Sequence, residues 1–161
     1  MKRLAALLAA ASCLALIDAQ GAEATTALPQ ARASWASAEN DLGETDPNLR
    51  LTNLVIVLNR PADRQKAFET LLAEQQDPQS PNFHRWLTPS EIGERFGPSD
   101  EDILAVRSWL ESHGLRVDSV AASRVRIEFS GRATDVGAAF GASLHAYLVE
   151  GETLISPAST A

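Results

Sequence analysis

Side chains that could do chemistry gather in residues 80–99, which read SPNFHRWLTPSEIGERFGPS. The imidazole of His84 lies between the aromatic residues Phe83 and Trp86, and the carboxylate of Glu91 follows in the same stretch. An imidazole and a carboxylate are common partners in general acid–base catalysis. Aromatic side chains are equally typical of the centre of a protein interface. The stretch is therefore a candidate catalytic segment or binding surface, and the third interpretation is a connection between helices.

The other two histidines do not favour catalysis. His113 directly precedes Gly114, where a helix is expected to end, and a helix C-terminus favours an imidazolium through the macrodipole. His145 falls within an alternating strand pattern, and no two histidines have a metal-binding spacing such as H-x-x-x-H. Three histidines and 21 acidic residues permit many imagined triads, so the composition is no evidence for an enzyme. We expect no catalytic, cofactor-binding or metal-binding residue in this chain.

The second half of the stretch has a local explanation. Thr88-Pro89-Ser90-Glu91 is a capping box with proline at the first helical position, so a short helix begins here. Phe96-Gly97-Pro98 ends that helix. Residues 80–87, which carry the aromatic residues and the histidine, have no such local explanation.

Composition and charge describe an acidic globular protein. The chain has 161 residues, which predicts one domain, and 45% of them are hydrophobic while 22% are charged. The formal net charge is −7 and the sequence pI is about 4.9. Phosphate backbones are bound by basic stripes, so a nucleic-acid partner is excluded.

The N-terminal 24 residues are typical of a secretory signal peptide. Lys2 and Arg3 precede an apolar run over residues 4–17, and Ala22-Glu23-Ala24 is an A-x-A cleavage site. The run is too short for a membrane span. The single cysteine, Cys13, lies inside the run, and a lipoprotein is the less favoured alternative. We expect an exported protein, extracellular or periplasmic, that holds together without disulfides and does not associate with a membrane after signal cleavage.

Apolar periodicity divides the remainder into three parts. Residues 25–50 are expected to form a flexible N-terminal arm, residues 51–149 the folded domain, and residues 150–161 the start of a C-terminal linker. The domain pattern predicts a strand, two helices with an insert between them, two strands, a helix and a last strand: residues 54–58, from Asp63 to about 76, from Ser99 to about 113, 115–120, 124–129, 132–140 and 143–149. This order predicts an α+β ferredoxin-like sandwich, with an antiparallel sheet, helices on one face and a short helical insert.

In the first helix, the helical period places Phe68, Leu71, Leu72 and Gln75 on one face. Ser99 and Asp102 form an acidic variant of the capping box, and Gly141 closes the last helix. The link over residues 121–123 suggests a hairpin, and Val125, Ile127 and Phe129 alternate toward a core.

The segment DPQSPNFHRWLTPSEIGERFGPS resembles the signature of the pro-kumamolisin activation domain, the propeptide of the sedolisin family of serine-carboxyl peptidases. The matching positions are Asp77, Pro78, Ser80, Pro81, Phe83, His84, Trp86, Leu87, Thr88, Pro89, Glu91, Ile92, Arg95, Phe96, Gly97, Pro98 and Ser99. The later segments VRSWLESHGL, RVRIEFSG and VGAAFGASLHAY are also similar to the family, so the resemblance runs in order from about residue 51 to 149.

The resemblance implies a ferredoxin-like sandwich that acts as an intramolecular chaperone and inhibitor of a sedolisin-type peptidase, in cis or in trans, and is removed at acid pH. The chain itself contains no Ser-Gly-Thr-Ser run, which carries the family's nucleophile, so it is expected not to be an enzyme. Calcium is expected only in the peptidase domain. A stand-alone secreted binding or inhibitor module with the same fold is the alternative, and whether the chain is a fragment or a truncated gene stays open.

The candidate peptidase-contact residues within the signature are Phe83, His84, Trp86, Leu87, Glu91, Arg95 and Phe96. Two interpretations compete for the aromatic members: packing onto the domain's own sheet, which we favour, and contact with the peptidase. We expect the tail after Val149 to pass through the peptidase cleft as a poor substrate. Carboxylates paired in the complex would lose their stabilising contribution as the pH falls through their lowered pKa, which predicts release in acid.

Overall fold

The computed structural model describes residues 33–158, so the predicted signal peptide and residues 25–32 of the predicted arm lie outside the described part. Six strands and four helices follow in the order β1 (Asp41–Glu44), β2 (Arg50–Val57), α1 (Ala62–Glu74), α2 (Pro89–Phe96), α3 (Asp100–Ser112), β3 (Arg116–Val120), β4 (Arg126–Arg132), α4 (Ala133–Phe140), β5 (Leu144–Val149) and β6 (Glu152–Pro157). None of these helices is long and apolar enough to cross a membrane.

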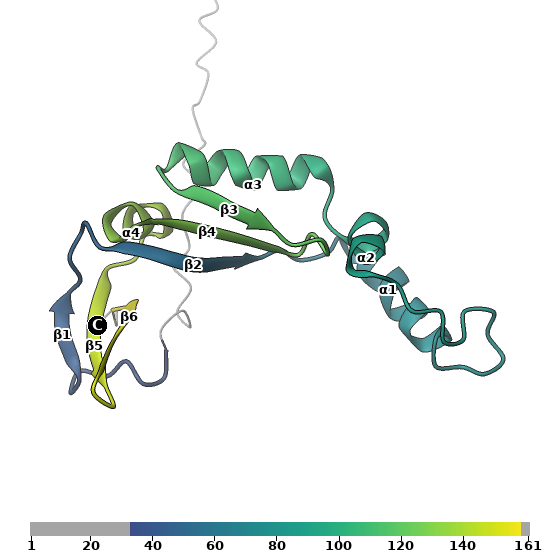
Figure 1. Ribbon diagram of the computed structural model, residues 1–161, viewed down its shortest axis with the longest axis horizontal. Coiled ribbons are helices and arrows are strands. Elements are labelled where there is room, and N and C mark those ends of the chain that lie inside the picture. The colour runs from purple at the N-terminus through teal and green to yellow at the C-terminus, as the bar shows by residue number, and fades with distance from the viewer. Residues whose placement is uncertain (1–32, 159–161) are drawn as a thin grey trace, which may run out of the picture.

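The main sheet has the order β2-β4-β3 and is antiparallel throughout. Helices α3 and α4 cover one of its faces (Figure 1). Ile127 and Phe129 alternate toward these helices on β4 and are buried, as the pattern of this strand predicts. They meet the buried Leu110 of α3 and Val136 of α4 in the hydrophobic core. Burial of each large side chain contributes about 1.5–3 kcal/mol, so this core holds the two layers together.

A second sheet, with the order β1-β5-β6, lies beside the first. It corrects two expectations, because residues 41–44 of the predicted arm and residues 152–157 of the predicted linker are strands. Strand β5 pairs along both of its edges, and Glu150 and Gly151 form the tight turn to β6 with positive φ angles. Tyr147 of β5 is only 2% exposed and packs edge-to-face against Trp35. These two short segments therefore form strands here because β5 offers them backbone partners.

The predicted α+β ferredoxin-like fold, with antiparallel strands and helices, is confirmed. The hairpin between β3 and β4 is also confirmed, and α4 ends at the predicted Gly141. One feature differs from the expected single sheet: β5 pairs with β1 and β6 rather than with the main sheet. Its two neighbours in the second sheet come from segments whose composition indicates no strand.

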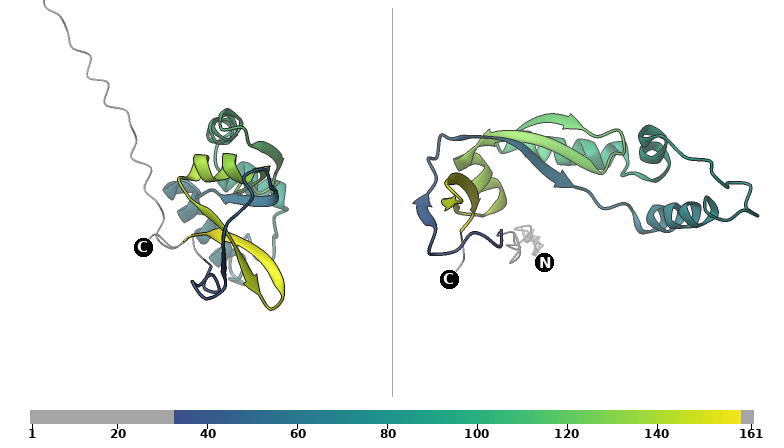
Figure 2. Two further views of the ribbon diagram at one scale, coloured as in Figure 1. Left: turned by 90° about the vertical axis from the view of Figure 1, so that its left-hand side faces the viewer. Right: turned by 60° about the horizontal axis from the view of Figure 1, so that its bottom comes forward.

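Helices α1 and α2 form a unit that projects beyond the end of the main sheet, on the side away from the second sheet (Figures 1 and 2). The rings of Phe68 and Phe96 join the two helices with centroids 5.3 Å apart. Helix α1 begins at Ala62 after Pro61, which makes no side-chain cap, so the predicted cap Asp63 lies inside the first turn instead. The fixed φ of proline leads the chain into the helix at this point.

Helix α2 attaches this unit to the main sheet through an unusually close approach. A side chain at Gly93 would place its Cβ 2.1 Å from the carbonyl oxygen of Ala122, in the turn between β3 and β4. A Cβ at Gly97 would lie 2.8 Å from the Cβ of Arg124 in the same turn. Glycine is therefore required at Gly93 by the backbone of the neighbouring turn rather than by its own conformation.

Candidate functional site

The aromatic loop, residues 77–87, connects α1 to α2 at the far end of the projecting unit (Figure 1). Local turns build its first half. The Asp77 carboxylate accepts a hydrogen bond of 2.9 Å from the amide of Gln79, and the Asp77 carbonyl accepts one of 3.0 Å from Ser80. The amide of Phe83 then donates to the carbonyl of Ser80 at 3.1 Å. The loop is thus hydrogen-bonded along its own backbone before it reaches the aromatic residues.

Gln75, at the end of α1, holds the second half of the loop. Its carbonyl accepts a hydrogen bond of 3.1 Å from the amide of His84, and its side-chain amide donates to the carbonyl of Arg85. Gln75 is only 3% exposed, so the loop closes over it. Nearby, the side-chain amide of Asn82 donates to the Glu74 carboxylate at 2.7 Å. Buried polar groups are costly unless they are paired, and here the pairing sets the path of the loop.

His84 has a φ angle of +56°, in the left-handed region that non-glycine residues seldom adopt. Such a conformation costs about 1–3 kcal/mol and persists where the surroundings impose it. The hydrogen bonds that join Gln75 to the His84 amide and to the Arg85 carbonyl supply that constraint. The backbone at His84 is therefore held in a strained state that aims its ring.

Three rings stack as a result. The rings of Phe83 and His84 are 3.7 Å apart between centroids, with an interplanar angle of 22°. The rings of His84 and Trp86 are 5.9 Å apart at 24°. Trp86 is 67% exposed, and the loop lies away from both sheets (Figure 2). The favoured expectation that these aromatic residues pack onto the domain's own sheet is therefore wrong, because the helical unit projects past the end of that sheet.

The other candidate contact residues lie on α2 or just before it, and most have a structural partner. Glu91 completes the predicted capping box: its carboxylate accepts from the Thr88 amide at 2.7 Å, and the Thr88 hydroxyl accepts from the Glu91 amide at 3.3 Å. These hydrogen bonds hold the pKa of Glu91 below its ordinary value. Phe96 is buried against Phe68, with the Arg95 guanidinium 5.0 Å from the centre of the Phe96 ring. Leu87 is half-buried.

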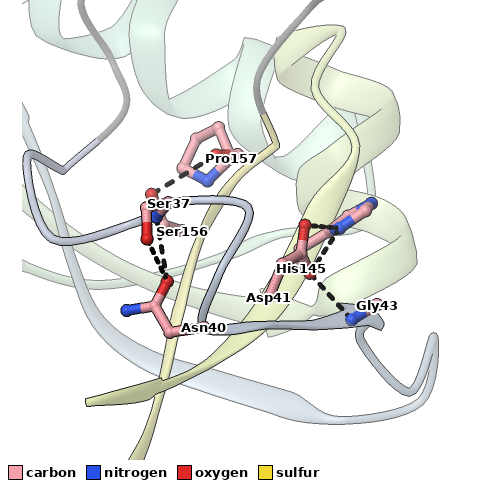
Figure 3. Close-up of polar contacts among 7 residues, drawn as sticks. All are labelled: Ser37, Asn40, Asp41, Gly43, His145, Ser156 and Pro157. Atoms are coloured by element: carbon pink, nitrogen blue, oxygen red, sulfur yellow. Dashed lines mark hydrogen bonds and ion pairs between the residues drawn. The ribbon is translucent and has the colours of Figure 1, made fainter.

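A second polar site joins β1 to β5 (Figure 3). Nδ1 of His145, on β5, lies 2.9 and 3.0 Å from the two carboxylate oxygens of Asp41, on β1. The Gly43 amide donates to the same carboxylate at 2.7 Å. This amide, and then His145, hold the pKa of Asp41 below its ordinary value. Sequence reasoning missed the pair because Asp41 lies in the predicted arm, and the only local signal is the Asp-x-Gly turn.

Residues 33–40 cover the face of the second sheet that carries this pair. The amide of Ala33 donates to the hydroxyl of the buried Ser156 at 3.3 Å, so the N-terminal segment contacts β6. Asn40 closes the segment, since its side-chain oxygen accepts from the Ser37 amide at 2.9 Å (Figure 3). The Asn40 carbonyl accepts from Leu148 of β5 at 2.9 Å. The segment that precedes β1 is thus tied to both β5 and β6.

The described residues include a carboxylate–imidazole pair and an exposed ring stack. Asp41 and His145 resemble two members of a serine-type triad, but within residues 33–158 no hydroxyl group is hydrogen-bonded to His145. His84 stacks on aromatic rings, and Nδ1 of His113 lies 2.8 Å from the carbonyl of Trp109. The three histidines therefore lie in separate parts of the fold. Over the same described residues no group of three or more potential metal ligands is found. The exposed aromatic loop is the feature that offers a partner a surface.

Comparison with known proteins agrees with these observations. The family described as pro-kumamolisin, activation domain, matches residues 37–161. The chain is 32% identical to the tripeptidyl-peptidase sed1 of Aspergillus fumigatus over 83 residues, half of this chain and 13% of that protein. It is 34% identical to xanthomonalisin of a Xanthomonas species over 85 residues, 53% of this chain and 10% of that protein.

Aorsin of Aspergillus oryzae is 35% identical over 51 residues, which are 32% of this chain and 8% of that protein. The matched part of the chain therefore spans about a tenth of the length of these sedolisin-family peptidases. The family match covers both sheets, all four helices and the aromatic loop. The chain belongs to the pro-kumamolisin activation domain family.

Proposed function

We propose that this chain is the propeptide of an exported sedolisin-type serine-carboxyl endopeptidase, which it helps to fold and keeps inactive until acid-triggered cleavage. The observation that carries the proposal is the family match over residues 37–161, which includes every strand and helix described above. The peptidase is the partner, in cis or in trans, and the chemistry belongs to it. Consistent with this role, the described part of the chain offers an exposed aromatic surface for a partner.

The second sheet changes where an inhibitory tail would begin. Strand β6 pairs with β5 from Glu152 to Pro157, so the backbone of these residues is engaged within the domain. A segment that is paired with β5 along one edge cannot also be enclosed along both edges by a peptidase cleft. We therefore place the start of the cleft-binding segment after Pro157 instead of after Val149. The turn at Glu150 and Gly151 becomes part of the domain.

Asp41 is a candidate for the carboxylate whose protonation triggers release in acid. Its pKa is lowered in the folded chain, chiefly by the Gly43 amide and further by His145. A carboxylate with a lowered pKa stabilises the folded state above its unfolded pKa, and this contribution is lost as the pH falls through the folded value. Protonation of Asp41 would thus weaken the turn to Gly43 within β1 and, to a smaller extent, the contact with His145 of β5 in acid. The resulting increase in motion would expose the chain around the second sheet to cleavage.

The proposal is tested by adding the full chain in trans to the peptidase domains of xanthomonalisin and sed1, each freed of its own propeptide. Hydrolysis of a peptide substrate is measured between pH 6 and pH 3. The expected result is inhibition at the higher pH that weakens as the pH falls. Absence of inhibition of both peptidases at every pH would contradict the proposal and favour a stand-alone binding module. Hydrolysis of the peptide by the chain alone would contradict both.

A further inference from the structure

We propose that this chain binds the peptidase domain through the aromatic loop, with Trp86 inserted into an apolar pocket of that partner. The inference rests on the proposed function and adds the contact surface to it. The ring stack of Phe83, His84 and Trp86 forms the surface, and Gln75 positions it.

Trp86 is more exposed than the other exposed aromatic side chains, Trp109 and Phe140. Trp109 is also partly exposed, but its ring packs against Phe140 and His113 with centroids 5.4 and 4.5 Å apart. Trp86 stacks with the His84 ring, and most of its surface is exposed to water. A tryptophan side chain buries about 150–250 Å² when it is covered, and tryptophans are enriched among the residues that dominate binding energies. An uncovered indole on a well-ordered loop is therefore a surface prepared for a partner.

The loop is also rigid before any partner binds. His84 is held in its left-handed conformation because the buried Gln75 accepts from the His84 amide and donates to the Arg85 carbonyl. This strain adds nothing to the hydrophobic core, since the loop lies beyond the end of the main sheet (Figure 2). Strained residues that the surroundings hold in place are concentrated at binding sites, where ordering in advance reduces the entropy lost on association. The Gln75 hydrogen bonds therefore hold the ring stack in place before a partner arrives.

The position of the loop indicates which partner covers it. Strand β6, from which the chain continues, lies in the second sheet, at the end of the molecule opposite the loop (Figure 1). A peptidase held only through the chain after β6 would be free to swing about that connection. A second contact at the far end fixes the orientation, and the linked contact benefits from a high effective concentration.

A second copy of this chain fits the surface less well. Each chain carries a formal net charge of −7, so two copies repel each other at neutral pH. The relatives, by contrast, carry the matched region within polypeptides about ten times longer, whose remainder is available to cover the loop. The occupant is therefore the peptidase domain.

The test measures inhibition of the same two peptidase domains, xanthomonalisin and sed1, by the full chain and three variants at pH 6. Trp86→Ala should raise the inhibition constant about 10- to 30-fold, as expected for a central aromatic anchor. His84→Gly keeps the left-handed backbone but removes a ring, and should raise it about 3- to 10-fold. Leu104→Ala is the matched control, because Leu104 is an exposed apolar residue on α3, and it should change the constant less than 2-fold. Equal thermal unfolding temperatures establish that the variants are folded.

A second readout follows the indole itself. With 5-fluorotryptophan incorporated, the resonances of Trp35, Trp86 and Trp109 are distinguished by ¹⁹F NMR, and only that of Trp86 should shift strongly when peptidase is added. Inhibition by Trp86→Ala equal to that of the wild-type chain, or an unmoved Trp86 resonance in an inhibited complex, would overturn this inference and leave the proposed function standing. Absence of inhibition by the wild-type chain would overturn the proposed function, and this inference with it.

Discussion

Replacement of Gly93 by alanine tests how the projecting helices are joined to the main sheet. In an exposed helix this change would stabilise the protein by about 1 kcal/mol, because alanine restricts the unfolded chain and favours helix. In this structure the new Cβ would lie 2.1 Å from the Ala122 carbonyl oxygen and 3.1 Å from the Ser123 carbonyl carbon. The first distance is about 1 Å shorter than real Cβ contacts allow.

The size of the effect follows from the kind of atoms that clash. Both neighbours belong to the backbone of the β3–β4 turn and cannot rotate away, so α2 as a whole must move. Overpacking of this kind costs about 1–3 kcal/mol, and an immovable backbone indicates the upper end of that range. After the gain in helix propensity is subtracted, we expect the free energy of unfolding to fall by about 2 kcal/mol.

Equilibrium urea unfolding of the full chain measures this value. With a slope of about 2 kcal/mol/M, typical of small domains, the midpoint of Gly93→Ala should fall by about 1 M. Glu94→Ala, at the next and exposed position of α2, is the control and should change stability by less than about 0.5 kcal/mol. If Gly93→Ala were as stable as the wild-type chain or more stable, α2 would not approach the turn as closely as described, and the argument would fail.

Three further predictions concern the second sheet and two helix ends. Asp41→Asn should leave the hydrogen-exchange protection of β1 equal at pH 6 and pH 3, whereas the wild-type chain should lose protection in acid, because the lowered pKa of Asp41 stabilises β1 only while the carboxylate is charged; equal behaviour of both proteins would contradict this. Thr88→Ala removes the hydroxyl that accepts from Glu91 and should destabilise the chain by about 1 kcal/mol in urea unfolding, with Ser90→Ala on the same helix as a near-neutral control. Gly141→Ala should cost about 1–2 kcal/mol because Gly141 ends α4 with φ at +61°, while Gly141→Asn should cost less; equal losses would show that the left-handed conformation is not the cause.

Local features could be predicted from the sequence because their hydrogen bonds close within a few residues. The capping boxes that begin at Thr88 and Ser99 are both present, with donors and acceptors three positions apart. The alternation of β4 likewise identified Ile127 and Phe129 as core residues. In each case a side chain or a period of two carries the information along the chain, and no distant segment is needed to form it.

The aromatic loop shows where local information ends. Its residues mark the family signature, but the signature does not say whether Trp86 faces the domain or the solvent. That was decided by the direction in which α1 and α2 leave the sheet, through the close contact of Gly93 with the β3–β4 turn. The rings stack on a strained loop because the buried Gln75 holds that loop. The helical period placed Gln75 on the inner face of the helix but did not indicate its hydrogen-bond partners.

The sequence by itself determined the fold class, the capped helices and the family, because periodicity, caps and motifs are properties of short segments. Only the tertiary structure decided that residues 41–44 and 152–157 are strands, and that Asp41 meets His145 across 104 positions of sequence. The physical reason is that an edge strand is formed by the hydrogen-bonding groups of its neighbour. Its own residues need not show a strand pattern, so the pairing of β1 and β6 depends on β5 rather than on their own sequences.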